Sequence, residues 1–134
     1  MQINLSQKTA IITGAAGHGL GRADAFALGK AGCKIAVIDV MDCTETVNLL
    51  GEAGIEAKGY QCDISDADAC KSIVDQIASD FGSVDILVNN AAIISTAGMF
   101  LDIPVEKWNQ DVQVNLIGSA NMSRATWPHL LKNS

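Results

Sequence analysis

The residues best suited to chemistry in this sequence form a glycine-rich turn near the N-terminus. The turn reads Thr13-Gly-Ala-Ala-Gly-His-Gly-Leu-Gly21 and separates an apolar run from a helical pattern. Gly14 allows a sharp exit from a strand, and Gly19 and Gly21 let backbone amides approach a pyrophosphate. The N-terminus of the next helix would direct its positive dipole end toward the same phosphates. The turn therefore predicts a dinucleotide site formed by Gly14, His18, Gly19 and Leu20.

A single acidic residue, Asp39, ends the second apolar run. A carboxylate at this place accepts both hydroxyls of the adenosine ribose and repels a 2′-phosphate. The next residues, Val40 and Met41, supply no arginine to compensate. We therefore expect NAD to be preferred over NADP. The alternative role, capping of the next helix, suits Asp42 or Thr44 better than Asp39.

Four short apolar runs alternate with helical patterns, which is typical of βαβ units and a parallel sheet. The predicted strands are residues 8–13, 34–38, 57–62 and 84–88, and the predicted helices are residues 20–31, 44–53, 65–82 and 104–131. Right-handed crossovers give an α/β, Rossmann-type doubly wound sheet with strand order 3-2-1-4. We expect residues 1–134 to form a single dinucleotide-binding domain that is incomplete at its C-terminal side, truncated before a fifth strand.

Local patterns make three more specific predictions about the helices. A capping box, Ser65-x-x-Asp68, is expected to begin the third helix, and Gly82 to end it. The fourth helix is expected to start near Pro104 and to run to about Leu131, with Pro128 bending or ending its last turns. In the first helix, small residues should face the sheet together with one leucine: Leu20, Ala23, Ala27 and Ala31.

Composition excludes several classes of function. The net charge is -6 and the nine basic residues are scattered, which argues against nucleic-acid binding. No apolar run is long enough for a membrane helix and no secretory signal pattern is found, so we expect a cytoplasmic protein. The four cysteines match neither a C-x-x-C motif nor a zinc site, and they predict buried free thiols without a metal.

Three segments resemble the short-chain dehydrogenase/reductase family, and the resemblance covers the whole chain. Thr13–Ala23 resembles the T-G-x-x-x-G-x-G turn, 85–92 the N-N-A-G strand end, and 108–118 a mid-helix segment with an asparagine. Two departures stand out. Four residues rather than three separate Gly14 from Gly19, which places an additional residue near Gly17-His18, and Ala92 replaces the last glycine of N-N-A-G. With this longer tip, His18 is either a phosphate contact or an exposed loop residue.

The resemblance assigns roles to further residues. Asp63 and Ile64 would hold the adenine edge, although Asp63 has an alternative role in simply preceding a Ser65 cap. Asn90 and Ala91 would lie beside the cofactor. Asn115 would be a member of a catalytic tetrad that holds a water in a proton relay; its alternative role is a local backbone bond that bends the helix.

The activity implied by the resemblance is hydride transfer between NAD and a small-molecule alcohol or ketone, in a protein that forms homo-oligomers (dimers or tetramers). The family's catalytic serine and Tyr-x-x-x-Lys pair have no counterpart here, since the only tyrosine, Tyr60, is followed four residues later by Ile64. We therefore expect this chain to supply the cofactor-binding half and to be inactive alone. The alternative is a non-enzymatic dinucleotide-binding module or an inactive fragment. An extended-type relative fits poorly because its glycine spacing is tighter.

Overall fold

The computed structural model describes residues 3–133. Met1, Gln2 and Ser134, the outer limits of the predicted domain, lie outside the described residues. Strands and helices alternate along most of the chain: β1 (Thr9–Thr13), α1 (Leu20–Lys30), β2 (Lys34–Asp39), α2 (Thr44–Glu52), β3 (Ala57–Gln61), α3 (Ala67–Phe81) and β4 (Ile86–Val88). A short 3₁₀ turn η1 (Phe100–Asp102) then leads to α4 (Val105–Val112), a π-helical turn η2 (Gln113–Gly118), α5 (Ser119–Leu130) and a final 3₁₀ turn η3 (Leu131–Asn133).

The four strands form one parallel sheet with the order β3-β2-β1-β4, which confirms the predicted strand order. Thr9 lies opposite Lys34 at the start of the β1–β2 pair, and Ile38 lies opposite Tyr60 in the β2–β3 pair. β1 and the interior of β2 are buried, as expected for apolar strands covered on both faces. The weaker third run is an edge strand, as its polar composition predicts.

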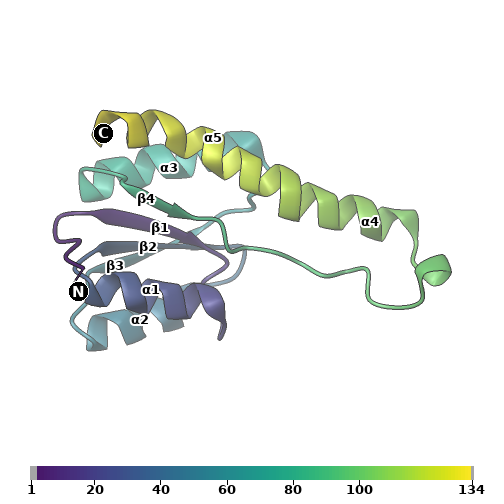
Figure 1. Cartoon of the computed structure of the whole chain (residues 1–134), viewed down its shortest axis with the longest axis horizontal. Coiled ribbons are helices and arrows are strands. Elements are labelled where there is room, and N and C mark those ends of the chain that lie inside the picture. The colour runs from purple at the N-terminus through teal and green to yellow at the C-terminus, as the bar shows by residue number, and fades with distance from the viewer. Residues whose placement is uncertain (1–2, 134) are drawn as a thin grey trace.

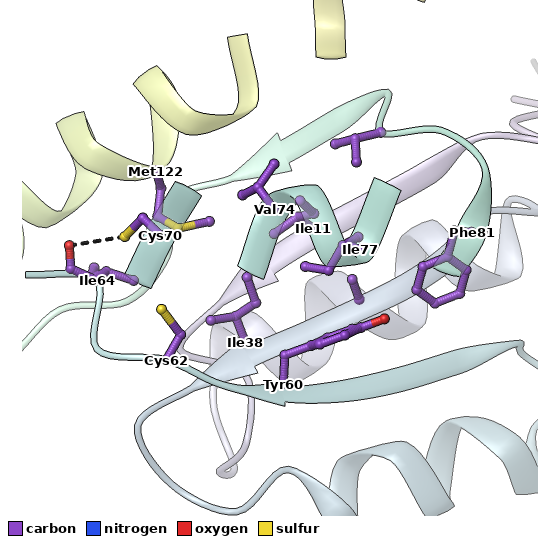
Figure 2. Packing of buried hydrophobic residues seen from close by; sticks show 12 residues of the cluster. Ile11, Ile38, Tyr60, Cys62, Ile64, Cys70, Val74, Ile77, Phe81 and Met122 are labelled. Atoms are coloured by element: carbon purple, nitrogen blue, oxygen red, sulfur yellow. Dashed lines mark hydrogen bonds between the residues drawn. The ribbon is translucent and has the colours of Figure 1, made fainter. Parts of the chain in front are cut away.

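Helices cover the sheet on both faces, with α1 and α2 on one side and α3 and α5 on the other (Figure 1). Alternate residues of β1 and β2 serve the two layers. Ile11 and Ile38 pack with the α3 residues Val74 and Ile77 (Figure 2). On the other face, Ile12 lies in a core with Ala25 of α1 and Leu50 of α2. These two cores fix the strand ends that carry the candidate site.

The first helix approaches the sheet through a different face from the one expected. Gly21 and Ala25 are buried, whereas Leu20 is 77% exposed and Ala23 and Ala27 are also exposed. The prediction that Leu20, Ala23 and Ala27 face the sheet was wrong. Its physical reason is that the closest approach is made by a glycine, which an apolar periodicity does not register.

The third helix begins one residue later than the capping box predicts. The Asp66 side chain accepts hydrogen bonds from the backbone nitrogens of Asp68 and Ala69, so Asp66 is the N-cap and the prediction of Ser65 was wrong. The Ser65 hydroxyl instead donates to Asp63. Gly82 ends the helix in the left-handed conformation, at φ 86°, as predicted.

The fourth predicted helix is present as one continuous helical segment from Val105 to Leu130. Its middle six residues form the π-helical turn η2, which the sequence analysis did not predict. Pro128 lies inside α5, which ends at Leu130. α5 packs on α3, while α4 and the segment before it extend beyond the sheet (Figure 1). Among the helices of residues 3–133, none combines the length and apolar character needed to cross a bilayer.

Candidate functional site

The carboxyl ends of the strands open into a cavity of about 640 Å³. In a doubly wound sheet this edge, at the switch point between β1 and β4, is where ligands bind. The cavity brings together all nine residues that the sequence predicts as cofactor contacts: Gly14, His18, Gly19, Leu20, Asp39, Asp63, Ile64, Asn90 and Ala91. It also includes residues that sequence reasoning missed, among them Met41, Ile93, Gln110 and Val114.

The glycine turn is packed against the end of β4 at both of its ends. Gly14 has a φ of 67°, and a Cβ there would lie 2.6 Å from the Cα of Ala91. A Cβ on Gly21 would lie 2.5 Å from the Nδ2 of Asn90. Side chains at Gly17 and Gly19 would instead enter open space. Two glycines thus allow close packing, and two leave the backbone open toward the cavity.

Asn90 holds the glycine turn through its side chain. Its Nδ2 donates to the carbonyl oxygens of Thr13 and Gly14 at 2.8 and 3.0 Å. The buried hydroxyl of Thr13 accepts from the backbone nitrogens of Asn90 and Ala91 at 3.1 and 3.0 Å. Thr13 was missed as a site residue, although its place directly before Gly14 was visible in the sequence. The asparagine and the threonine together hold the ends of β1 and β4 against each other.

Asp39 joins the end of β2 to the same turn. One carboxylate oxygen accepts from the backbone nitrogen of Ala16 at 3.0 Å and the other from that of Met41 at 3.1 Å. The helix-capping alternative is not met by Asp39: the N-cap of α2 is Cys43, without a side-chain cap, and Asp42 accepts from the nitrogen and hydroxyl of Thr44 just before the helix. Asp39 is therefore available at the cavity wall while it also fixes the turn.

Arg22, a buried arginine that sequence reasoning missed, binds the backbone of the glycine turn. Arg22 is 7% exposed and donates to the carbonyl oxygen of Ala16 at 2.6 Å and to the Thr46 hydroxyl at 2.8 Å. It also forms an ion pair with Glu45 at 3.1 Å, and this interaction lowers the pKa of the Glu45 carboxyl. Because a guanidinium group only donates, its contact with His18 Nδ1 at 3.2 Å requires that nitrogen to accept.

With Nδ1 of His18 as an acceptor, the ring proton lies on Nε2, and this N–H faces the carboxylate of Glu45 at 3.6 Å. His18 thus lines the cavity as an exposed loop residue that is tied to the first turns of α1 and α2.

Asp63 and Ile64 form the wall of the cavity beyond β3. One oxygen of Asp63 accepts from the nitrogen and hydroxyl of Ser65, at 2.9 and 2.7 Å. Ile64 is 5% exposed, and its carbonyl oxygen accepts from the side chain of Asn121 at 3.0 Å. The turn at Ser65 and the position at the cavity wall are therefore compatible roles for Asp63.

Asn115 is the one predicted site residue that does not line the cavity. Its Oδ1 accepts from the backbone nitrogen of Ile93 and its Nδ2 donates to the carbonyl oxygen of Ile93, both at 2.8 Å. Ile93 is itself at the cavity wall. The side chain lies in the π-helical turn, so it joins this deformed segment to the chain that follows β4.

A second clamp, missed by sequence reasoning, holds the same chain segment to α4. The Asp111 carboxylate accepts from the backbone nitrogen and hydroxyl of Ser95 and from the hydroxyl of Thr96. The hydrogen bond from the Ser95 side chain is the main reason why the pKa of Asp111 is lowered. Asp111 was visible in the sequence as a carboxylate near Trp108. Its partners could not be inferred, because Ser95 and Thr96 lie 16 and 15 residues earlier in the chain.

Tyr60, the only tyrosine in the sequence, is not among the residues that line the cavity. Tyr60 is buried, and burial together with its hydrogen bond to Asp80 raises the pKa of its hydroxyl. This is the opposite of the change that a catalytic tyrosine needs. All four cysteines are buried free thiols, as predicted. Among residues 3–133 no group of three His, Cys, Asp or Glu side chains is placed to hold a metal ion.

Comparison with known proteins assigns the chain to a family. Residues 8–134 match the family model described as short chain dehydrogenase. The "Uncharacterized oxidoreductase YxbG" of Bacillus subtilis (strain 168) is 34% identical over 131 residues, covering 96% of this chain and 48% of the relative. "Glucose 1-dehydrogenase 2" of the same organism is 28% identical over 137 residues, covering all of this chain and 53% of the relative.

Solved structures agree with these sequence matches. Carveol dehydrogenase from Mycobacterium avium in complex with NAD superposes with a TM-score of 0.89 at 28% identity, over 97% of this chain and 52% of that one. NAD⁺-bound xylitol dehydrogenase gives a TM-score of 0.87 at 28% identity, over 99% and 51%. The chain spans about half the length of each of these relatives. With its sheet order, its glycine turn and these matches, the chain belongs to the short-chain dehydrogenase/reductase family of oxidoreductases.

Proposed function

We propose that this chain is the cofactor-binding half of an NAD-dependent oxidoreductase that transfers hydride between NAD and an alcohol or carbonyl substrate. The observation that carries the proposal is the convergence of all nine sequence-predicted contacts on one cavity at the carboxyl edge of the sheet. Two solved relatives that bind NAD share the fold over nearly the whole chain. The nicotinamide supplies the hydride acceptor, and the residues of this chain supply binding and orientation.

The pyrophosphate would lie over the glycine turn. A side chain at Gly17 or Gly19 would meet open space, and Gly19, the N-cap of α1, provides no side-chain cap. Backbone N–H groups at a helix start attract phosphate oxygens, and no side chain competes for them here. Gly14, Gly19 and Leu20 therefore hold the phosphates, and His18, tied to Arg22 and Glu45, borders them.

The adenosine would lie between β2 and β3. The Asp39 carboxylate accepts the ribose hydroxyls and repels a 2′-phosphate, which is the basis of the proposed NAD preference. The Arg22 guanidinium, in the first turn of α1, already donates to Glu45, Thr46 and the Ala16 carbonyl oxygen. Asp63 and Ile64 then hold the adenine edge, with the carboxylate accepting from the exocyclic amine.

Asn90 and Ala91 hold the cofactor from the β4 side, and Asn115 is proposed as the catalytic asparagine. Its paired bonds to Ile93 fix the chain that faces the nicotinamide end. Tyr-x-x-x-Lys does not occur in the 134 residues, so we expect these residues alone to bind NAD and to show negligible turnover. The serine, tyrosine and lysine belong, in this proposal, to the half of the relatives' length that this chain does not span.

The proposal extends to the whole protein. It acts in the cytoplasm as a homo-oligomer, a dimer or a tetramer, on a small alcohol or ketone and without nucleic acid or membrane. Support for association comes from apolar side chains of α4 and its neighbours that are strongly exposed in this chain: Leu101, Val105, Val112 and Leu116, at 92, 67, 51 and 64%. Exposed apolar surface of this kind marks a contact surface.

A second function, a dinucleotide sensor without catalysis, is favoured by one observation only, the absence of Tyr-x-x-x-Lys from these residues. The two functions differ in turnover. NADH formation from NAD by the whole protein, screened against small secondary alcohols, supports the enzyme. NAD binding with no turnover in a whole protein that lacks Tyr-x-x-x-Lys supports the sensor.

Calorimetric titration of NAD into the protein tests the site itself, with Gly19→Asp as the decisive variant. An aspartate at this N-cap position stabilises the helix and enters open space, so folding survives. Its charge opposes the pyrophosphate, and we expect NAD affinity to fall by at least about tenfold. Gly51→Asp adds the same charge in open space outside the cavity and should leave binding unchanged. Equal affinities for the two variants would contradict the proposed site.

A further inference from the structure

A set of hydrogen bonds joins the first turn of α2 to the residue proposed to bind the ribose. The Arg22 guanidinium donates to the carbonyl oxygen of Ala16 at 2.6 Å, and the backbone nitrogen of Ala16 donates to the Asp39 carboxylate at 3.0 Å. Arg22 also donates to a carboxylate oxygen of Glu45, in α2, at 3.1 Å. In this set of contacts one buried cation is linked to two carboxylates, directly to one and through a single residue to the other.

The position of the cation is fixed by the start of α2. Arg22 is 7% exposed, and its Nε donates to the hydroxyl of Thr46 at 2.8 Å. That hydroxyl is itself buried and lies 2.8 Å from the carbonyl oxygens of Ala15 and Ala16. Because a guanidinium group in a protein keeps its proton, this positive charge is permanent. It is therefore held one residue away from the Asp39 contact.

A permanent positive charge at this place favours NADP over NAD, because the 2′-phosphate of NADP adds negative charge at the ribose. Glu45 opposes this effect through its ion pair with Arg22. The hydrogen bond from Arg22 lowers the pKa of the Glu45 carboxyl, so Glu45 is charged at neutral pH. Its side chain is 61% exposed and is not among the residues that line the cavity. Glu45 therefore acts through its charge and not through contact with a ligand.

We propose that Glu45 is a second determinant of the preference for NAD over NADP, because it neutralises the Arg22 charge beside the ribose site. The inference rests on the proposed function, since it requires a dinucleotide in the cavity. Asp39 acts on a 2′-phosphate from the cavity wall, whereas Glu45 acts from α2, outside the cavity. Charges interact across several ångströms without contact, and dissolved salt screens the interaction.

Glu45→Gln tests the inference. The amide keeps the size of the side chain and an oxygen that accepts from Arg22, but it loses the charge. Calorimetric titration measures NAD affinity, and displacement of bound NAD measures NADP affinity. We expect the ratio of NAD to NADP affinity to fall by about threefold or more at low ionic strength. The change should shrink in about 1 M salt, where charges are screened beyond about 3 Å.

Two control variants separate charge from structure. Glu45→Asp keeps the charge in the first turn of α2, and its ratio should stay closer to that of the natural chain than the ratio of Glu45→Gln does. Glu52→Gln removes the same charge from an exposed side chain at the end of α2, outside the cavity. It should leave the ratio unchanged.

Three results overturn the inference: a ratio in Glu45→Gln equal to that of the natural chain at low salt, an equal fall in Glu45→Asp, or a fall that high salt does not reduce. The last two would mean that the shape of the contact matters and its charge does not. A natural chain that binds neither dinucleotide overturns both proposals. NAD binding with an unchanged ratio in Glu45→Gln overturns this inference and leaves the proposed function in place.

Discussion

The carboxylate of Asp39, at the end of β2, accepts a hydrogen bond from the backbone nitrogen of Ala16 in the glycine turn at 3.0 Å. The residue proposed to read the ribose therefore also holds the turn proposed to bind the phosphates. The two ends of the adenosine diphosphate site are fixed relative to each other by one side chain. A change of cofactor preference at this position consequently also affects how rigidly the turn is held.

Asp39→Asn tests the proposed preference for NAD over NADP. The amide keeps the size and one acceptor of the carboxylate but loses its charge, so the repulsion of a 2′-phosphate disappears. We expect the ratio of NAD to NADP affinity to fall by about tenfold or more, measured by calorimetry with both dinucleotides. Asp42→Asn, a change of the same charge outside the cavity, is the matched control. An unchanged ratio in Asp39→Asn would show that another group sets the preference.

Gly21→Ala tests the close packing of α1 against β4. The added methyl group would lie 2.5 Å from the Asn90 Nδ2 and 2.7 Å from the Gly14 carbonyl oxygen. We expect the free energy of unfolding to fall by about 1–3 kcal/mol, measured by chemical denaturation. The control, Gly51→Ala in α2, meets open space and should raise stability by about 0.5–1 kcal/mol. A Gly21 variant as stable as the control would refute the packing described.

Asn115→Ala tests the connection between the π-helical turn and the chain after β4. The change removes both hydrogen bonds to Ile93, and we expect a loss of about 1–2 kcal/mol in local stability. Hydrogen exchange should show it as faster exchange of the Ile93 amide. Gln113→Ala, in the same turn, removes only a long 3.4 Å contact and serves as the control. Equal exchange in both variants would mean that Asn115 does not hold this segment.

Asp85 gives a prediction about acid stability. Burial raises the pKa of its carboxyl, but hydrogen bonds from the Thr9 backbone, Lys8 and Ser83 outweigh this and hold it below the ordinary value of 3.8. The unfolded chain therefore binds this proton more readily than the folded one. The stability that Asp85 contributes is fully present above the ordinary pKa and is lost as pH falls through the folded value.

Asp85→Asn should accordingly be less stable than the natural chain at pH 7 and should lose less stability between pH 5 and pH 3, about the range in which aspartates titrate. Urea unfolding at several pH values measures both effects. Asp102→Asn, at an exposed carboxylate, should follow the natural chain. The same acid loss in Asp85→Asn as in the natural chain would place its origin in other carboxyls.

The sequence alone predicts those features of the structure that are determined by residues close together in the chain. The strands around Ile11 and Val37 follow from continuous apolar runs, and the turn at Gly14 follows from its glycines and its place after a strand. β4 is shorter than predicted, beginning at Ile86. Asp85, inside the predicted run, directs its carboxylate at Lys8 and Thr9.

The features that could not be predicted depend on partners distant in the sequence. The π-helical turn contains Asn115, whose bonds go to Ile93, and no periodicity within the helix encodes that contact. Arg22 is buried because Thr46 and Glu45 of α2 reach it across the glycine turn. The nine predicted cavity residues converge because each follows a strand, so the topology alone brings them to one edge.

The glycine turn is fixed at Gly14 and Gly21 by the end of β4, whereas Gly17 at its tip meets no other heavy atom within 4 Å of a would-be Cβ. Loop length and loop anchoring are thus independent properties of this turn. The additional residue near Gly17 and His18 lies between these two anchors, at a tip where an added side chain meets open space. We therefore expect a change in the length of the tip to alter the proposed phosphate contacts while the packing of α1 against β4 stays in place.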